Sequence, residues 1–210
     1  MKNKILLFAF AIIGFTSQAQ IEHKITFEAS YGMSVPLSFI SLTDGNFNST
    51  SHFDGGIRYM FNNNWGIKGE MAYDKYTGKA ANYGMIAFVQ DVQMHYNLGR
   101  YTGLSDATNG IVGLYAHSGF GVATDRSLYN HAIEYSGTYI LGLSPIFKIC
   151  DHFALSTDIS YKLNMKQHIR YDGTFFVVPT VTNQTTSQVS FSIGGIYYIR
   201  SAKAHADWSR

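Results

Sequence analysis

The stretch KITFEASYGMSV, residues 24–35, decides the fold class of this protein. Every second residue from Ile25 to Val35 is apolar or small, and the residues between them are polar or glycine. Side chains on a β-strand point alternately to the two faces of the sheet, so this pattern predicts a strand with one apolar and one polar face. The strand is about twice as long as the five or six residues that are usual in globular domains.

The same two-residue period returns along the rest of the chain, and no segment shows a convincing helical period. The repeats lie at residues 52–61, 65–74, 84–98, 111–123, 135–149, 153–163 and 187–199. Long connections are predicted at 36–50, 75–83, 124–134 and 164–186, and shorter ones at 62–64, 99–110 and 150–152. Long loops on one rim and shorter turns on the other are typical of an antiparallel meander that closes into a barrel.

The first 19 residues predict an export signal. Lys2 and Lys4 precede an apolar run at 5–15, and Ser17 and Ala19 supply the small residues of a cleavage site. The apolar run is well short of the roughly 20 residues that a transmembrane helix needs. We therefore expect cleavage after Ala19 and export of the remaining chain.

Composition narrows the function classes further. The net charge of +2 and the charged share of 14% give no reason to expect nucleic acid or an acidic partner. Cys150 is the only cysteine, so no disulfide within the chain is possible. The exported chain must therefore be held together by core packing or by a bilayer.

The apolar faces of the strands admit two barrels: a soluble one that turns them inward around a ligand, and a membrane one that turns them outward into lipid. Three features favour the membrane. The strands are long enough to cross a bilayer, and aromatic residues lie near their ends, as interfacial girdles require. The polar faces combine small residues with charges of both signs, which suits a narrow interior; these charges are Glu28, Asp54, Arg58, Lys68, Glu70, Asp74, Asp158 and Lys162. The sequence thus predicts an all-β, eight-stranded antiparallel up-and-down transmembrane β-barrel over residues 20–200.

Four segments resemble a known family. The signal ending in SQAQ, the last strand FSIGGIYYI and the segment LGLSPIFKICDHFALSTDISYKLN at 141–164 are similar to the OmpA-type outer-membrane barrels found in Bacteroidetes-like bacteria. The tail AKAHADW at 202–208 resembles the short junction after such barrels. The resemblance implies an envelope protein in the cell outer membrane, often joined to a C-terminal domain that binds peptidoglycan. We expect no such domain in this chain, so residues 201–210 are interpreted as a periplasmic linker stub and peptidoglycan binding is not expected.

The charges on the polar faces are the candidate functional residues. In the family, interior salt bridges plug or gate the narrow lumen, and six residues here are chemically suited to do so: Glu28, Arg58, Lys68, Glu70, Asp158 and Lys162. The competing interpretation is that they only satisfy one another and specify the barrel. An eight-stranded barrel is just wide enough to be filled by side chains, so any conductance should be small.

Catalytic, cofactor and metal sites are not expected. The histidines are scattered, without the H-x-x-x-H or H-E-x-x-H spacing of a metal site. A rim-site enzyme could use His131 with Glu134, or His168 with Asp172, but no nucleophile signature such as G-x-S-x-G accompanies either pair.

The expected function is that of a non-enzymatic structural outer-membrane barrel, with weak passive pore activity at most. Its partners would be outer-membrane lipid and, if it is an accessory subunit, a larger membrane complex bound through the barrel wall or loops. Two different functions are also compatible with the sequence: a rim-site outer-membrane enzyme and a soluble ligand-binding barrel. None of these functions implies a cofactor, although the soluble barrel would hold a ligand.

Overall fold

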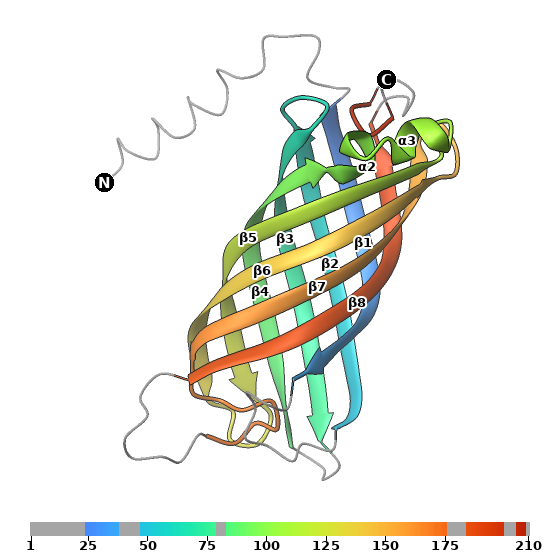
Figure 1. Ribbon diagram of the computed structural model, residues 1–210. Coiled ribbons are helices and arrows are strands. Elements are labelled where there is room, and N and C mark those ends of the chain that lie inside the picture. The colour runs from blue at the N-terminus through green and yellow to red at the C-terminus, as the bar shows by residue number, and fades with distance from the viewer. Residues whose placement is uncertain (1–23, 38–46, 79–82, 176–183, 200–204, 209–210) are drawn as a thin grey trace.

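The protein is a closed barrel of eight antiparallel strands (Figure 1). The computed structural model describes residues 24–37, 47–78, 83–175, 184–199 and 205–208, so the predicted export signal lies outside the described residues. The strands are β1 (Ile25–Pro36), β2 (Phe47–Met60), β3 (Trp65–Gly78), β4 (Gly84–Asn97), β5 (Val112–Ser127), β6 (Ile133–Lys148), β7 (Phe153–Gln167) and β8 (Gln184–Tyr198). The predicted fold class is confirmed.

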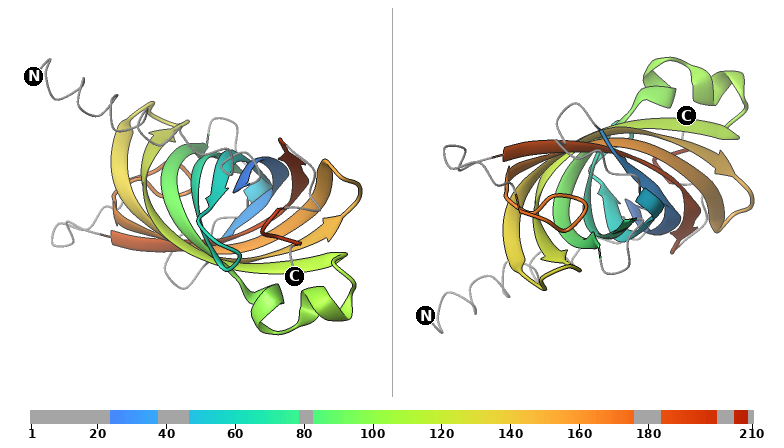
Figure 2. Two further views of the ribbon diagram at one scale, coloured as in Figure 1. Left: turned by 90° about the horizontal axis from the view of Figure 1, so that it is seen from above. Right: turned by 90° about the horizontal axis from the view of Figure 1, so that it is seen from below.

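Closure comes from the pairing of β1 with β8. The two strands run antiparallel in continuous register from Thr26 opposite Tyr198 to Pro36 opposite Gln188. Each strand also pairs with its neighbours in sequence, so the sheet has no free edge. Figure 2 shows the resulting ring of strands from its two ends.

The two rims of the barrel differ. One rim carries the turns at 61–64 and 149–152, the connection at 98–111 and the C-terminal residues 205–208, and is called the termini rim. The opposite end, where β1, β3, β5 and β7 finish, is called the loop rim. The connection on the termini rim contains two single-turn helices, α2 (Leu98–Tyr101) and α3 (Leu104–Ala107), which are too short to produce a helical period in the sequence. In the described part of the chain, no helix combines the length and apolar character that crossing a membrane demands.

The strands extend further toward the loop rim than the sequence predicted. The expected connections at 36–50, 75–83, 124–134 and 164–186 are partly strand, because β2 begins at Phe47, β3 reaches Gly78, β5 reaches Ser127 and β7 reaches Gln167. The apolar outward face becomes weaker there, while polar pairing continues inside: the Ser136 hydroxyl donates to Asp125 at 2.7 Å. The predicted boundaries were wrong because they followed the apolar face alone.

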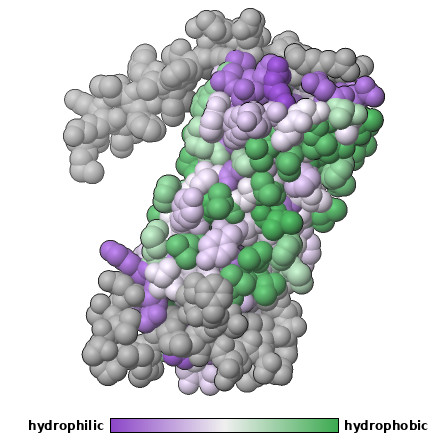
Figure 3. Space-filling view, viewed as in Figure 1, coloured by the Kyte–Doolittle hydropathy of each residue, from purple (hydrophilic) through white to green (hydrophobic). Residues whose placement is uncertain are grey.

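The outward faces form an apolar belt between two rings of aromatic side chains. Met71, Val92 and Phe120 are each more than half exposed at mid-height, and Figure 3 shows groups of hydrophobic side chains on the visible wall below a hydrophilic rim. Aromatic neighbours at the termini rim include Trp65 with Tyr96 (ring centroids 4.6 Å apart) and Phe153 with Tyr197 (5.2 Å). Nearer the loop rim, Tyr31, Phe53, Tyr73 and Phe88 follow one another in register across four strands.

The spacing of the two rings fits a bilayer. Trp65 and Tyr73 are eight residues apart on β3, which is about 26 Å of strand. With the usual tilt of about 40° this spans about 20 Å along the membrane normal, close to the height of the apolar band in outer-membrane barrels.

Candidate functional site: the polar lumen and its C-terminal plug

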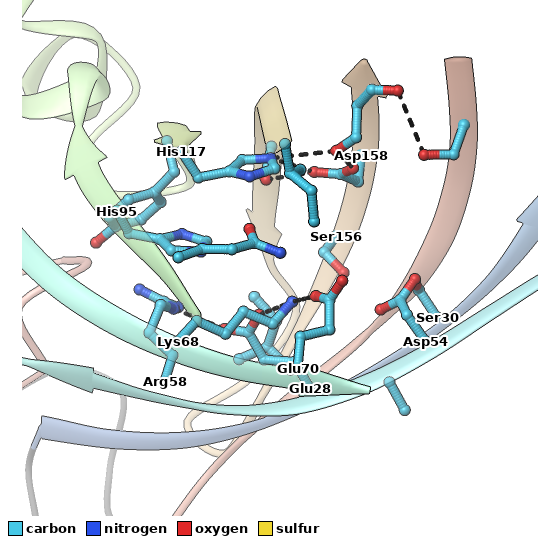
Figure 4. Close-up of a pocket in the computed structure, with 18 of the residues that line it drawn as sticks. Glu28, Ser30, Asp54, Arg58, Lys68, Glu70, His95, His117, Ser156 and Asp158 are labelled. Atoms are coloured by element: carbon cyan, nitrogen blue, oxygen red, sulfur yellow. Dashed lines mark hydrogen bonds and ion pairs between the residues drawn. The ribbon is translucent and has the colours of Figure 1, made fainter. Parts of the chain in front are cut away.

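The lumen is lined by the polar faces of the strands, and its termini-rim half contains a chain of ion pairs (Figure 4). Arg58 Nε donates to Glu28 Oε1 at 2.6 Å, and Lys68 Nζ lies 3.1 Å from Glu28 Oε2. Lys68 also pairs with Glu70 at 2.5 Å. Arg58 is only 1% exposed, and a buried charge is tolerated only where it is paired and hydrogen-bonded. Each charge in this chain has an opposite partner.

The C-terminal residues extend this chain. Residues 205–208 lie across the mouth of the barrel at the termini rim (Figures 1 and 2). The Asp207 carboxylate accepts two hydrogen bonds from Arg58, from Nη1 and Nη2, at 2.9 Å each. It also accepts from the hydroxyls of Tyr115 at 2.6 Å and Tyr198 at 2.8 Å. Asp207 is 2% exposed, so a segment interpreted as a linker stub is, in its described part, a plug packed into the barrel.

A second polar cluster fills the loop-rim half of the lumen. His52 bridges two carboxylates, with Nδ1 2.7 Å from Asp74 and Nε2 3.0 Å from Asp54. Lys162 Nζ lies 3.3 Å from the other oxygen of Asp74. The hydroxyl of Ser34 also donates to Asp74, which is completely buried. These contacts tie β1, β2, β3 and β7 together across the interior.

His117 and Asp158 form a third group on the opposite wall. His117 Nε2 lies 2.9 Å from Asp158, which also accepts from Ser144 at 2.6 Å and Ser160 at 2.5 Å. The His117 ring fits because its cross-strand neighbour is Gly142: a Cβ there would lie 2.5 Å from the ring nitrogen. Ser160 Oγ also lies 3.5 Å from His117 Nε2. Both hydroxyls nevertheless donate to the Asp158 carboxylate at shorter distances, so the group binds a carboxylate rather than pairing a nucleophile with its base.

Little free space remains between these clusters. The central cavity has a volume of about 40 Å³ and is lined by Glu28, Asp54, Lys68, His95, His117 and Asp158 among others. That volume holds about three water molecules. Buried polar atoms without a protein partner among the described residues, such as His95 Nε2 and Gln93 Oε1, are suited to bind such water.

The six predicted network residues do not form one network. Glu28, Arg58, Lys68 and Glu70 lie in one continuous chain. Asp158 belongs to the His117 group, and Lys162 belongs to the Asp74 cluster.

Several lumen residues escape prediction from the sequence. His52, His95 and His117 are far apart along the chain, although their strand positions place all three on the inward face. Asp207 and Trp208 fall within the segment that the sequence predicts to be a linker. A large aromatic residue next to an acid in an otherwise small and polar tail was the available signal.

The rim residues considered for an enzyme have structural contacts. Glu134 accepts the backbone N–H groups of His168 at 3.0 Å and Ile169 at 2.7 Å, and it pairs with the His168 ring at 3.2 Å. Asp172 accepts from the backbone and hydroxyl of Thr174. Glu134 therefore joins the 168–175 segment to β6 rather than acting beside His131. Across the described ranges, no cluster of three histidine, cysteine or acidic side chains has the geometry to hold a metal ion.

Comparison with known proteins finds a likeness in structure alone. Neither a protein-family model nor a curated protein matches the sequence. Among solved structures, Neisserial surface protein A has a TM-score of 0.53 and 13% identity, and the match covers 83% of this chain and 96% of that one. Ail, the attachment invasion locus protein of Yersinia pestis, gives 0.48 and 17%, covering 84% of this chain and 99% of that one. A de novo designed transmembrane β-barrel gives 0.41 and 12%, covering 86% of this chain and 98% of that one.

The chain is an outer-membrane β-barrel. The likeness to Neisserial surface protein A shows the fold, and the closed wall with its exposed apolar belt supplies the location. In lipid, every backbone hydrogen bond must be satisfied internally, which a closed barrel achieves. Outer-membrane barrels place short turns in the periplasm and longer loops outside, so the termini rim, with its turns at 61–64 and 149–152, faces the periplasm.

Docking of the plug should depend on pH through Asp207. Burial by itself would raise the pKa of this carboxyl, but Arg58 and His205 beside it hold the pKa well below its usual range. An undocked aspartate has a pKa of about 3.9. The stabilisation of docking by this group is therefore complete above that pH and is lost as pH falls through the lower pKa of the docked carboxyl.

Trp208 offers a direct readout of this pH dependence. In a Trp65→Phe variant it is the only tryptophan, and it is 7% exposed in the docked state. We expect its fluorescence to be shielded from acrylamide at pH 7 and at pH 5, and to become quenchable near pH 2. A variant that also carries Asp207→Asn should be readily quenched at pH 7. Shielding that persists unchanged at pH 2 while the barrel remains folded would contradict the role of the carboxylate.

Proposed function

We propose that this protein is a non-enzymatic structural component of the outer membrane, of the OmpA type found in Bacteroidetes-like bacteria, with a sealed lumen. The proposed organisation is an export signal at 1–19, a barrel at 20–200 and a periplasmic tail at 201–210. Its partner in this role is the lipid of the outer membrane, and peptidoglycan binding through this chain is not proposed.

The observation that carries the proposal is the filled lumen. The ion-pair chain from Asp207 through Arg58 and Glu28 to Lys68 and Glu70 crosses the interior on the periplasmic side. The Asp74 cluster occupies the outer side. The cavity of about 40 Å³ between them is too small to carry a hydrated ion. A barrel filled in this way serves as a rigid wall element and at most as a weak passive pore.

The non-enzymatic assignment is supported by how the polar groups are used. The inward serines, histidines and carboxylates bind one another, and Glu134 and Asp172 at the loop rim bind backbone groups. Catalysis requires a nucleophile hydrogen-bonded to a base beside a space for substrate. Ser160 Oγ lies 3.5 Å from His117 Nε2, but it donates to Asp158 at the shorter distance of 2.5 Å.

Planar-bilayer recordings test the sealed lumen. We expect the wild-type protein to show no stable open state, because no continuous water path crosses the two clusters. Lys68→Ala removes the link between Glu28 and Glu70 and enlarges the central cavity, so it should produce measurable open events. Lys75→Ala, which removes an exposed lysine from the outward face of the same strand, is the matched control and should behave like the wild type. A stable wild-type conductance would overturn the proposal.

A further inference from the structure

The plug is held by a carboxylate-binding socket that the barrel itself builds. The socket consists of Arg58 on β2, Tyr115 on β5 and Tyr198 on β8, which together direct two guanidinium nitrogens and two hydroxyls at the Asp207 carboxylate. Arginine and carboxylate in this two-pronged geometry form one of the strongest and most directional pairs in proteins. Four donors on one carboxylate are more than charge neutralisation requires, and they define a site with a fixed orientation.

The barrel orients the socket through contacts that do not involve the plug. Glu28 binds the Nε of Arg58 at 2.6 Å, and the guanidinium lies 4.6 Å from the centre of the Tyr115 ring. Arg58 Nη1 also lies 3.4 Å from the sulfur of Met60. These contacts fix the plane of the guanidinium, so the two nitrogens that face Asp207 are positioned before a carboxylate arrives. Such preorganisation lowers the entropic cost of binding.

An apolar surface lies next to the socket and receives the aromatic residue that follows the acid. Ala206 and Trp208 pack into a buried cluster with Met60, Tyr115, Ile146, Ala154, Ile196 and Tyr198. The Lys148 ammonium lies 5.8 Å from the centre of the Trp208 ring, which is within the range of a cation–π contact. The surface therefore recognises an aromatic side chain adjacent to the carboxylate.

The plug is attached to the barrel through side chains. The carboxylate of Asp207 and the indole of Trp208 make the contacts above, whereas Trp208 N donates to His205 O at 3.0 Å within the segment itself. A segment attached in this way can be replaced by an equivalent peptide without disturbing the strands of the barrel.

We propose that the periplasmic mouth of the lumen is a binding site for a short peptide that carries a carboxylate next to an aromatic residue, and that residues 205–208 are its resting occupant. The tail competes with peptides in solution because it is part of the same chain, which gives it an effective concentration on the order of millimolar. A peptide supplied by another protein binds when the tail leaves the socket. This activity is additional to the structural role proposed above and does not depend on whether the lumen conducts.

Binding of a labelled peptide to the full-length protein tests the site. The probe is AKAHADWSR with a dye at its N-terminus, and its fluorescence anisotropy is measured with refolded protein in detergent micelles. The receptor variant is Asp207→Ala with Trp208→Ala, which removes both anchors of the resident tail but leaves the socket. We expect this variant to bind the probe at least tenfold more tightly than the wild type, whose own tail occupies the site.

Two matched controls separate the socket from non-specific adsorption. The probe AKAHANWSR, with an amide in place of the carboxylate, should bind the receptor variant at least tenfold more weakly. Adding Arg58→Lys to the receptor variant keeps the charge beside Glu28 but removes the two-pronged geometry, and should weaken binding to a similar extent. Heat-modifiable migration on gels verifies that each variant is folded. If Asp207→Ala prevents folding, Asp207→Asn replaces it.

The outcomes are distinct from those of the conductance experiment. Absence of binding to the folded receptor variant would overturn the peptide site while leaving the sealed lumen untouched. Equal binding of the acidic and amide probes would show adsorption to the apolar surface alone and would also overturn it. A stable wild-type conductance would instead overturn the sealed lumen and leave the peptide site standing.

Discussion

Arg58→Met is expected to lower the free energy of unfolding of the barrel by about 3–5 kcal/mol, the usual cost of removing one partner from a buried ion pair. Arg58 is the only residue that contacts both Glu28 and Asp207 among the described ion pairs. Methionine approximates the volume of the arginine stem but leaves the buried Asp207 carboxylate with only the His205 ring, 3.0 Å from Oδ1, as a basic neighbour among the described ion pairs. Urea unfolding in lipid vesicles, followed by tryptophan fluorescence, measures the change.

Two further variants show whether the loss comes from the unpaired carboxylate. Lys75→Ala, on the outward face of β3, should change the unfolding free energy by no more than about 0.5 kcal/mol, as is usual for exposed sites. Asp207→Ala added to Arg58→Met should recover part of the loss, because the orphaned charge is gone. A cost below about 1 kcal/mol for Arg58→Met would mean that the pair is not buried as described.

Val92→Arg should be the most damaging single charge on the outer wall. Val92 lies at the middle of β4 and is 55% exposed, and its cross-strand neighbours are Gly69 and Phe120. A cation facing lipid at the bilayer midplane costs about 2–4 kcal/mol in barrels of this type. The same urea titration in vesicles gives the value.

The control for Val92→Arg is the same substitution at an outward-facing position near the rim of the barrel. Tyr135→Arg places the same charge on the outward face of β6 close to the loop rim, where the native side chain is 73% exposed. Its cost should fall to about 0–1 kcal/mol, because arginine there reaches the interface. Equal costs at the two positions would show that the apolar belt does not face lipid.

The fold could be predicted from the sequence because one rule applies along the whole barrel. Each strand alternates with a period of two, so identifying one apolar position fixes the face of every other residue on that strand. The positions of Glu28, Arg58 and Lys68 in this alternation place their side chains inside the barrel, where the structure has them. The strand ends at the loop rim could not be predicted in this way, since the apolar face weakens there while the hydrogen bonding continues.

The alternation predicts which side chains point into the lumen, but it does not predict which of them pair, because pairing depends on distances between strands. The two-residue alternation puts Asp158 and Lys162 on the same inward face of β7. Their partners lie on different strands that do not pair with β7: His117 is on β5 and Asp74 is on β3. Choosing them requires the register of several strands together with the barrel radius. The plug was harder still to predict from the sequence, because residues 205–208 follow no strand period and their contacts come from three separate strands.

The closure of β1 against β8 has a consequence for the order of assembly. Ser30 and Ser192, whose hydroxyls are 2.9 Å apart, are separated by 162 positions in the chain, and contacts between such distant residues form slowly during folding. The socket draws its donors from β2, β5 and β8, so it is complete only after the wall has closed. Asp207 follows Tyr198 by nine positions and finds its partners after the last strand is in place. Burial of Trp208 therefore marks a barrel whose wall has closed.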